Sequence, residues 1–280
     1  MSNNLLQKNC SQRPFLKWAG GKYRLLEKIK SVLPPGNRLI EPFAGAAALF
    51  LNTGYKDYWL NDINTDLITL YRQLKTKNKQ FIEFAETFFK PENNNDKRYY
   101  QLREYFNNCR DRSERSALFL YLNRHSYNGL CRYNKKGQFN APFGRYKNPC
   151  FPKQQLLAFS QKANRVKFTH KNFIEVMQAA KAGDVIYCDP PYIPLTKTAN
   201  FTHYSQRKFS EEQQQKLAEL AQSLAKQNIP VIISNHNTSF TRKLYQAATL
   251  KKFTAPRLIS CKGNNRQAVK ELLAIYGVNK

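Results

Sequence analysis

The sequence predicts an α/β fold whose sheet is interrupted by a long, mainly helical insertion. Residues 38–40 and 184–188 are short apolar stretches that run directly into turns, as buried parallel strands do. Between them, from about residue 66 to 149, apolar residues recur at helical spacing, and no strong strand pattern appears before Tyr133. The chain is therefore expected to form a discontinuous α/β domain and one inserted domain, with the boundaries 1–63 and 151–280 for the first and 64–150 for the insertion.

The composition favours a polyanionic partner. The 280 residues contain 46 Lys and Arg against 19 Asp and Glu, a formal net charge of +27, and an excess of this size favours nucleic acid. The alternative is a generally basic protein whose charge has no binding role. Aromatic residues make up 13% of the chain, which suits base stacking as well as core packing, and the hydrophobic content of 41% supports a substantial core.

The sequence carries no pattern of a metal site, a disulfide framework or a membrane segment. The six cysteines are scattered, without a Cys-x-x-Cys pair or matching histidine spacing, so free thiols are expected. Residues 1–13 are polar and are interpreted as a disordered lead-in, not a signal peptide. No apolar run reaches the length of a membrane span. We expect an intracellular, cytoplasmic protein that is a monomer.

The first ordered segment combines glycines with a lysine. Residues 14–22 read Pro-Phe-Leu-Lys-Trp-Ala-Gly-Gly-Lys and precede a helical stretch that ends near Leu33. The adjacent Gly20 and Gly21 allow the backbone to approach a ligand closely, and Lys22 could reach a carboxylate or a phosphate. Taken alone, the segment is explained equally well as a plain loop that leads into a helix.

A strand, a turn of small residues and a helix follow in residues 38–50, which is the pattern of a first βα unit in a nucleotide-binding fold. Its single glycine, Gly45, makes it a weak form of the glycine-rich fingerprint. A second strand at residues 58–60 leads to Asp62. Asp62 lies 21 residues after Glu41, close to the spacing of ~20 at which an acid meets ribose hydroxyls. The alternative is a helix-capping aspartate, and the spacing favours the ligand interpretation.

The predicted insertion is helical first and basic and aromatic at its end. Residues 121–150 contain no Asp or Glu, whereas a solvated face normally carries both signs of charge. Residues 135–137 have the composition of a hairpin tip between residues 132–134 and 138–140. Such a segment resembles a surface that contacts nucleic acid. Apolar residues at helical spacing occur before it, in 67–74, 81–89, 99–106 and 117–122.

The α/β pattern resumes after the insertion. Ser210 and Gln213 have the spacing of a capping box at the start of a long helix. Residues 270–276 fit a final edge strand and a short helix equally well. The other predicted elements are a strand at 165–169, a helix at 172–181, the strand at 184–188, a loop at 193–209, the long helix to about 227, a strand at 230–235 and a helix at 238–248.

The clearest candidate for chemistry is Asp189-Pro190-Pro191-Tyr192, directly after the strand at residues 184–188. In an open α/β sheet, ligands bind at the carboxyl ends of the strands. The Asp189 carboxylate and the Pro190 carbonyl could together accept both hydrogens of one amino group and turn its lone pair toward an electrophile. Tyr192 offers a surface for stacking. On these residues alone, a proline-rich turn without function is an equally good interpretation.

Five motifs are recognisable together: Lys17-Trp18-Ala19-Gly20-Gly21-Lys22, Glu41-Pro42-Phe43-x-Gly45, Asn128-Gly129-Leu130-Cys131-Arg132-Tyr133, Pro142-Phe143-Gly144-Arg145-Tyr146 and Asp189-Pro190-Pro191-Tyr192. In this order they resemble the Dam family of DNA adenine-N6 methyltransferases, over nearly the whole chain. The resemblance implies a Rossmann-like S-adenosylmethionine-dependent methyltransferase sheet, with a target-recognition domain that carries a β-hairpin. It also implies methyl transfer from S-adenosylmethionine to N6 of adenine in double-stranded DNA at GATC, after the base flips out of the duplex.

The resemblance assigns roles to individual residues, and none of them is a metal ligand. The implied catalytic residues are Asp189, Pro190 and Tyr192. The residues expected around the cofactor are Trp18, Gly20, Lys22, Glu41, Phe43, Gly45, Asp62, Asn172, Phe173 and Asp189. The residues expected on DNA are Lys17, Tyr127, Asn128, Leu130, Arg132, Pro142, Arg145 and Tyr146.

In the family, the position of Lys17 reads the first guanine, and those of Leu130 and Arg132 read the second half of the site. Leucine against a thymine methyl and a cation against a base edge are chemically sensible major-groove contacts. Tyr127 and Asn128 match residues that enter the gap near the flipped base. For the hairpin residues, phosphate positioning is the milder alternative.

The chain departs from the family pattern at two places. Ala47 stands where relatives commonly have a second glycine, and His125-Ser126 differs from the usual pair before Tyr127. The methyl group of Ala47 is small, so weaker cofactor affinity is the most it is expected to cause. Two alternatives are a methyltransferase for another DNA sequence or for RNA, and a DNA-binding protein that has lost turnover. The intact Asp189 argues against the second.

Overall fold

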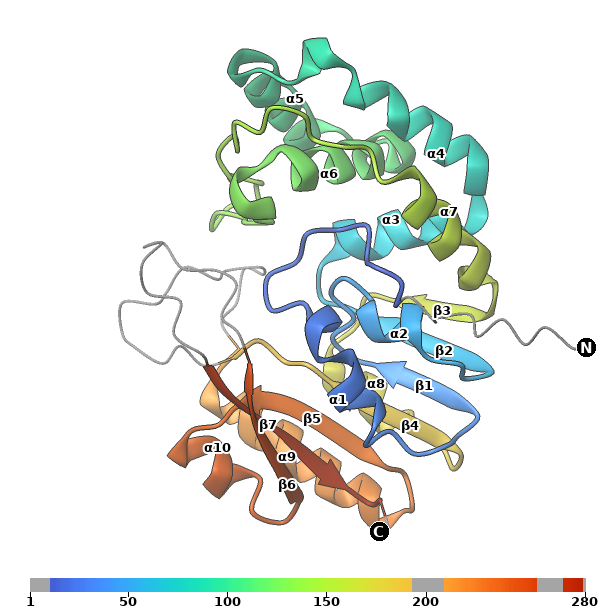
Figure 1. The fold of residues 1–280 in the computed structure, drawn as a ribbon, viewed down its shortest axis with the longest axis vertical. Helices are drawn as coiled ribbons and strands as arrows, with labels where there is room; N and C mark the ends of the chain where they lie inside the picture. Colours follow the sequence, from blue (N-terminus) through green and yellow to red (C-terminus); the bar gives the residue numbers. More distant parts are fainter. Residues whose placement is uncertain (1–10, 193–208, 256–268, 279–280) are drawn as a thin grey trace, which may run out of the picture.

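A seven-stranded sheet occupies the lower half of the molecule in Figure 1. The computed structural model describes residues 11–192, 209–255 and 269–278. The strand order is β3-β2-β1-β4-β5-β7-β6. Six strands run in the same direction, and β7 runs in the opposite direction. The strands are β1 (Arg38–Glu41), β2 (Asp57–Asn61), β3 (Val166–Thr169), β4 (Asp184–Cys188), β5 (Val231–His236), β6 (Thr249–Ala255) and β7 (Val269–Tyr276).

The strand order reverses between β1 and β4 at the centre of the sheet. From β1 the chain continues to β2 and β3 on one side, whereas β4 and β5 lie on the other side. Arg38 at the start of β1 forms an ion pair of 2.6 Å with Asp184 at the start of β4, which ties the two strands at that end. The opposite, carboxyl ends of β1 and β4 flank the reversal, which is where open α/β sheets bind ligands.

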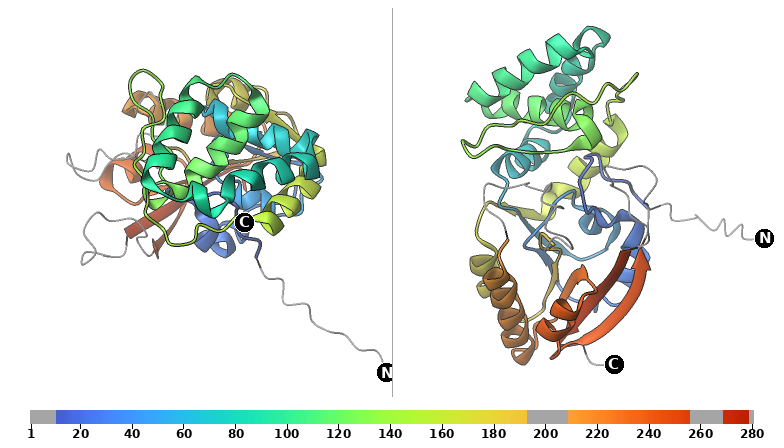
Figure 2. Two further views of the ribbon diagram at one scale, coloured as in Figure 1. Left: turned by 90° about the horizontal axis from the view of Figure 1, so that it is seen from above. Right: turned by 90° about the vertical axis from the view of Figure 1, so that its left-hand side faces the viewer.

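Helices cover both faces of the sheet: η1 (Lys22–Leu25), α1 (Leu26–Lys30), α2 (Ala48–Asn52), α8 (Phe173–Gln178), α9 (Glu211–Lys226) and α10 (Ser239–Leu244). Successive strand residues point to opposite faces. Accordingly, Leu39 packs in one apolar cluster with α1 and α2, and Ile40 packs in a second cluster with α8 and α9. The right-hand view of Figure 2 shows α9, in orange-brown, along one side of the sheet. The predicted capping box between Ser210 and Gln213 starts α9.

The insertion forms a helical layer above the sheet in Figure 1. Its central helix is α6, which contacts α3, α4 and α5 as well as η2 and η4, and is buried at nearly every position from Ser116 to His125. The helix after the insertion, α7, packs against α3 and α4 and extends this layer. The elements are α3 (Thr65–Thr76), α4 (Asn78–Glu86), η2 (Thr87–Phe89), η3 (Pro91–Asn93), α5 (Asp96–Asn108), α6 (Arg112–His125), η4 (Tyr127–Gly129), α7 (Lys153–Lys162) and η5 (Ala163–Arg165).

The predicted hairpin is confirmed. The Asn134 N–H donates to the Gln138 carbonyl at 2.9 Å and the Asn140 N–H donates to the Arg132 carbonyl at 2.8 Å. An antiparallel bridge joins Tyr133 and Phe139 between these bonds. The tip at residues 135–137 therefore projects from the helical layer on two short paired segments.

Several elements differ from the expectations. Residues 270–276 form a strand, but β7 lies between β5 and β6 and is not an edge strand. Strand β6 and helix α7 were not predicted, because Lys251-Lys252 interrupts the alternation of β6 and α7 begins inside the proline-containing segment that follows the hairpin. The first helix ends at Lys30, ahead of Leu33 and the helix-breaking Pro34. The expectations for residues 1–10 and 193–208 lie outside the described residues.

In the described part of the chain, no helix combines the length and the apolar character that crossing a membrane requires. Cys109, Cys131, Cys150 and Cys188 are free thiols. Within the same residues, no three His, Cys, Asp or Glu side chains are grouped as a metal ion would need.

Candidate active site

The carboxylate of Asp189 is held at the carboxyl end of β4 by two side chains from other elements. Lys22 Nζ, from η1, lies 2.8 Å from Asp189 Oδ1. Ser234, on β5, donates from Oγ to the same oxygen at 2.9 Å. Because both contacts use Oδ1, Oδ2 keeps its full capacity to accept a hydrogen bond from a ligand. The side chain of Asp189 is 20% exposed, which is enough for access.

The two proline carbonyls of the Asp-Pro-Pro-Tyr turn differ in their partners. Gln214 Nε2 donates to the Pro191 carbonyl at 3.1 Å and anchors the turn on α9. Among the described residues, no hydrogen bond to the Pro190 carbonyl is found. Of the two carbonyls, that of Pro190, the residue directly after Asp189, is therefore the one that can accept a hydrogen bond from a ligand.

Tyr192 packs beside this pair of acceptors. Its ring centroid lies 4.7 Å from Lys22 Nζ and 4.5 Å from the ring of His236, in an edge-on arrangement. Its hydroxyl is buried near Asp189, Ser234 and Glu271, and it forms no well-aligned hydrogen bond in the described part of the chain. The ring is thus fixed by contacts on its plane and edge, and the hydroxyl is a polar group that a bound ligand could satisfy.

Lys22 is the buried cation of the site. Burial by itself would lower the pKa of Lys22. Electrostatic interactions with Asp189, Tyr187 and Glu271 raise it, and the net result is a pKa above the ordinary value. The ammonium also donates to the Gly20 carbonyl at 2.7 Å. Lys22 therefore stays charged, orients Asp189 and connects the glycine loop to the catalytic turn.

Asp62 supports the turn after β1. Its Oδ2 accepts the Gly45 N–H at 3.0 Å and its Oδ1 accepts the Asn64 N–H at 2.9 Å. The cap of α3 is Asn64, whose side chain accepts the Leu67 N–H, so Asp62 is not the capping residue. Burial raises the pKa of Asp62, and these backbone donors act against the rise.

The turn itself has a backbone that suits glycine. Gly45 has a φ of 46°, and a Cβ built there would lie 3.0 Å from the Trp18 ring, so Trp18 lies directly on this residue. Ala47 has a φ of 56°, in the left-handed region. This conformation costs an L-residue about 1–2 kcal/mol. Glycine would adopt this backbone conformation without that cost.

Glu41 is buried beneath the same turn. Its Oε1 accepts the Phe50 N–H at 3.0 Å. Burial raises the pKa of Glu41 to about 8, and the Phe50 N–H works against this rise. Near neutral pH the folded protein therefore retains a proton on a carboxyl that would be ionised in water.

We expect Glu41→Gln to reduce the loss of stability at high pH. The folded pKa lies above the ordinary 4.5, so stability is fully present below pH 4.5 and is lost as pH rises toward about 8. Glutamine mimics the protonated acid and has nothing to ionise. Thermal unfolding at a series of pH values should show a smaller fall in Tm for the variant between about pH 5 and 8. Glu27→Gln, on an exposed side chain of α1, is the control; superimposable profiles for Glu41→Gln and the control would contradict the role of burial.

Apolar and aromatic side chains lie beside the carboxyl ends of β1 and β2. The Phe43 ring is 5.3 Å from that of Phe173 and 5.5 Å from that of Phe209. Asn172, expected beside the cofactor, accepts the Ile174 N–H and caps α8. Ile63 is 56% exposed directly after Asp62. Ile63 was not identified as a site residue from the sequence. Its only signal there is its position directly after Asp62, which follows β2.

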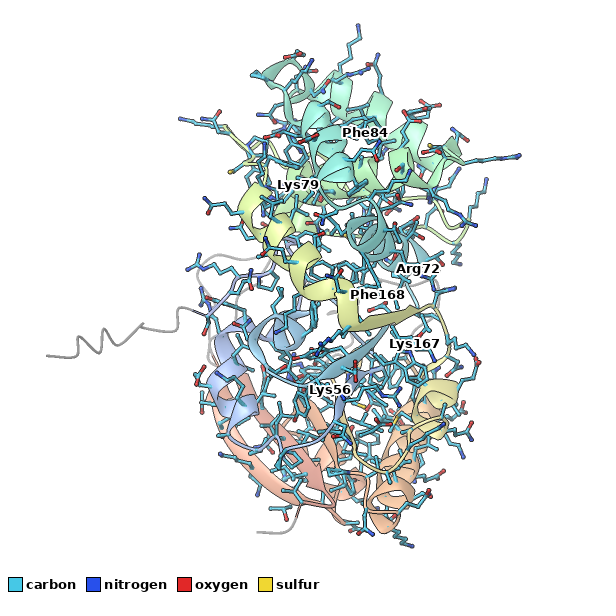
Figure 3. All side chains as sticks on the ribbon, turned by 90° about the vertical axis from the view of Figure 1, so that its right-hand side faces the viewer. Lys56, Arg72, Lys79, Phe84, Lys167 and Phe168 are labelled. Carbon is cyan, nitrogen blue, oxygen red and sulfur yellow. The ribbon has the colours of Figure 1, made fainter. Side chains whose placement is uncertain are left out.

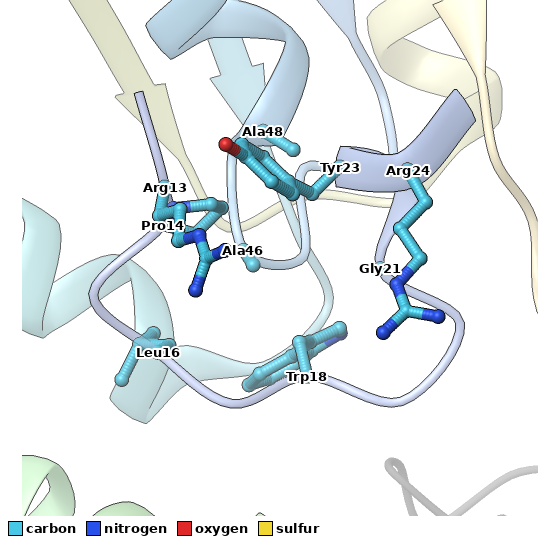
Figure 4. A pocket seen from close by; sticks show the side chains of 9 residues that line it. All are labelled: Arg13, Pro14, Leu16, Trp18, Gly21, Tyr23, Arg24, Ala46 and Ala48. Atoms are coloured by element: carbon cyan, nitrogen blue, oxygen red, sulfur yellow. The ribbon is translucent and has the colours of Figure 1, made fainter. Parts of the chain in front are cut away.

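A hollow of ≈ 270 Å³ lies next to Trp18 and Gly21 (Figure 4). Of the expected cofactor residues it contains only Trp18; Asp62 and Asp189 are not in its lining. A second hollow, of ≈ 500 Å³, lies at the opposite ends of the strands, and its lining includes Lys167 on β3, which is labelled in Figure 3. It contains none of the expected site residues.

Most of the residues expected on DNA gather around Lys17. Lys17 Nζ lies 3.8 Å from the centre of the Tyr146 ring, and the Asn128 N–H donates to the Tyr146 hydroxyl at 2.8 Å. The Tyr127 N–H donates to the Pro142 carbonyl, and the Tyr127 side chain is 50% exposed. Burial, with a smaller contribution from the charge of Arg124, lowers the pKa of Lys17 to about 8.

Arg132 is held by the hairpin. Arg132 donates from Nε to Asn140 Oδ1 at 2.8 Å and from its terminal nitrogen to the Asn140 carbonyl at 3.0 Å. Leu130 is half-buried. Arg145 has a φ of 52° and is exposed.

Comparisons with known proteins give matches over nearly the whole chain. The model of the family described as D12 class N6 adenine-specific DNA methyltransferase matches residues 18–258. A protein of Salmonella typhi named DNA adenine methylase is 52% identical over 264 residues, which cover 94% of this chain and 95% of the relative. Proteins of the same name are 51% identical in Escherichia coli strain K12, over 94% of this chain and 95% of the relative, and 50% identical in Vibrio cholerae El Tor, over 95% and 96%.

Proposed function

The chain belongs to the D12 class of N6 adenine-specific DNA methyltransferases, and from this premise we propose that it methylates adenine within GATC in double-stranded DNA, with S-adenosylmethionine as methyl donor. The observation that carries the mechanism is the environment of Asp189. Its Oδ1 is fixed by Lys22 and Ser234, while no hydrogen bond to Oδ2 or to the Pro190 carbonyl is found within the residues that the structure describes. The proposed monomer acts alone on one duplex.

The residues at the carboxyl ends of β1 and β2 fit an adenosine cofactor. Asp62 supplies a buried carboxylate at the place where ribose hydroxyls bind in nucleotide folds. Ile63 and Phe43 offer apolar surface for a purine, with Phe173 against Phe43. S-adenosylmethionine supplies an electrophilic methyl group. Trp18, Gly20, Lys22, Glu41, Gly45 and Asn172 complete the set that we assign to its site.

The chain's own contribution to catalysis is orientation and charge. Asp189 Oδ2 and the Pro190 carbonyl accept the two hydrogens of the adenine amino group, which directs the nitrogen lone pair toward the methyl group. The carboxylate stabilises the positive charge that develops on this nitrogen. Tyr192 stacks on the base and excludes water. Lys22 holds Asp189 in place through its contact with Oδ1 and does not contact the base.

Sequence recognition is assigned to the inserted domain, residues 64–150, together with Lys17 from the catalytic domain. The catalytic domain comprises residues 1–63 and 151–280. Lys17 reads the first guanine, and Leu130 and Arg132 read the second half of the site. Because the amino group lies inside the duplex, the adenine must flip out, and Tyr127 and Asn128 fill the gap. Pro142, Arg145 and Tyr146 complete the DNA contacts.

The test is methylation by the purified full chain. Duplexes with one GATC and with the same bases scrambled are incubated with radiolabelled S-adenosylmethionine. Label is expected only in the GATC duplex, and nucleoside digestion followed by mass spectrometry should place it on N6 of adenine. Equal labelling of both duplexes would reject the GATC assignment, and absence of label in both would reject S-adenosylmethionine as donor.

A further inference from the structure

A buried amide connects the segment of Lys17 to the last turn of α6. Asn123 is 0% exposed. Its Oδ1 accepts the Lys17 N–H at 2.9 Å, and its Nδ2 donates to the Lys17 carbonyl at 2.7 Å. One side chain thus satisfies both backbone groups of a single residue, as a neighbouring strand would. The backbone of Lys17 is therefore held at a fixed distance from α6 and in a fixed orientation to it.

The same amide also contacts the turn that precedes Leu130. Asn123 Nδ2 lies 3.2 Å from the Gly129 carbonyl. Gly129 has a φ of 66°, and a Cβ there would lie 2.3 Å from Lys17 Cβ, so the turn packs directly on Lys17. Segments 106 residues apart in the chain are thereby joined through one side chain.

We propose that Asn123 is a positioning residue that fixes Lys17 in register with the base-reading turn at residues 129–132. This inference rests on the proposed function, in which Lys17 reads the first guanine and the turn leads to Leu130 and Arg132. Asn123 is buried and contacts no DNA. It acts through Lys17, because a lysine side chain reaches one base edge only if its backbone is held at a defined distance from the groove.

A purely structural role for Asn123 makes a different prediction. The loss of a buried hydrogen-bonded amide destabilises any fold, but by itself it leaves discrimination between DNA sequences unchanged. Asn107 is a matched control because it makes the same pair of bonds on the hairpin. Its Oδ1 accepts the Phe139 N–H at 2.8 Å, and its Nδ2 donates to the Phe139 carbonyl at 3.2 Å.

The test compares Asn123→Ala and Asn107→Ala on duplexes in which one adenine is the only acceptor. GATC is a palindrome, so the adenine of the complementary strand is methylated beforehand. The ratio of kcat/KM for GATC to that for TATC then measures reading of the first guanine. We expect this ratio to fall about tenfold or more in Asn123→Ala, which corresponds to about 1.4 kcal/mol, and to stay at the wild-type value in Asn107→Ala.

An unchanged ratio in Asn123→Ala, or an equal fall in both variants, would overturn the inference. If Asn123→Ala does not fold, Asn123→Asp provides the same test, because it keeps the volume and the acceptor for the Lys17 N–H but loses the amide donor to the Lys17 and Gly129 carbonyls and to Cys131 Sγ; its ratio should fall as well. The wild-type protein distinguishes a failure of the proposed function from a failure of the role proposed for Asn123. Wild type without preference for GATC over TATC refutes the proposed function, whereas a selective wild type with an equally selective Asn123 variant refutes only the role of Asn123.

Discussion

Asp189→Asn is expected to lower the rate of methyl transfer by roughly 10²–10³-fold, the usual cost of removing one preorganised electrostatic contact in an active site. Asparagine has nearly the same shape, but it lacks the negative charge that stabilises the methylated nitrogen. It also leaves the buried ammonium of Lys22 without its counter-charge. Single-turnover measurements at saturating DNA and cofactor would give the rate, and fluorescence anisotropy with labelled DNA should show binding that is largely retained.

Asp184→Asn is the matched control for this variant. Asp184 lies on the same strand, at its other end, and pairs with Arg38 at 2.6 Å. Its loss should lower Tm without a comparable loss of rate, since neither side chain is near the catalytic turn. Wild-type turnover by Asp189→Asn would refute the catalytic assignment. A rate that fell equally in both variants would attribute the effect to stability.

Arg132→Ala is expected to relax discrimination in the second half of the site by about 1–3 kcal/mol, the value of a good bidentate contact to a base. Asn140 holds the guanidinium through two bonds, of 2.8 and 3.0 Å, so the side chain is oriented before DNA binds. Lysine cannot reproduce this planar geometry, and Arg132→Lys should recover little of the discrimination. The measurement is kcat/KM for GATC and for duplexes changed at the third or fourth base, again with one adenine available.

Lys136→Ala removes one positive charge at the exposed tip of the same hairpin and is the control for charge alone. It should weaken activity on all duplexes about equally, and more so at low salt. If Arg132→Ala gives the same uniform loss, Arg132 contacts phosphate and not a base.

The sequence alone predicts those elements whose pattern is contained in a short run of residues. The strand before Asp189 and the capping box of α9 follow from short runs of residues, and the hairpin tip follows from Lys-Lys-Gly between paired segments. Strand β6 was not predictable in this way, because its lysines interrupt the apolar alternation and its pairing with β7 comes from distant residues.

The same distinction applies to the site. The motifs named Asp189, Lys22 and the Gly45 turn, but they did not indicate that one oxygen of Asp189 is occupied by Lys22 and Ser234. Asn123 was not recognised, because a buried asparagine near the end of a helix has no local signature. Its role depends on a contact with Lys17 across 106 positions.

The placement of β7 between β5 and β6 has a consequence for how the chain folds during synthesis. Strand β6 is made before β7, yet its only paired neighbour in the described sheet is β7. The outer part of the sheet therefore cannot assemble until residue 276 has left the ribosome. Helices α3 to α6, by contrast, all lie within residues 65–125 and can pack earlier, since contacts closer in sequence form faster. The half that carries Asp189 is thus completed on a helical layer that is already in place.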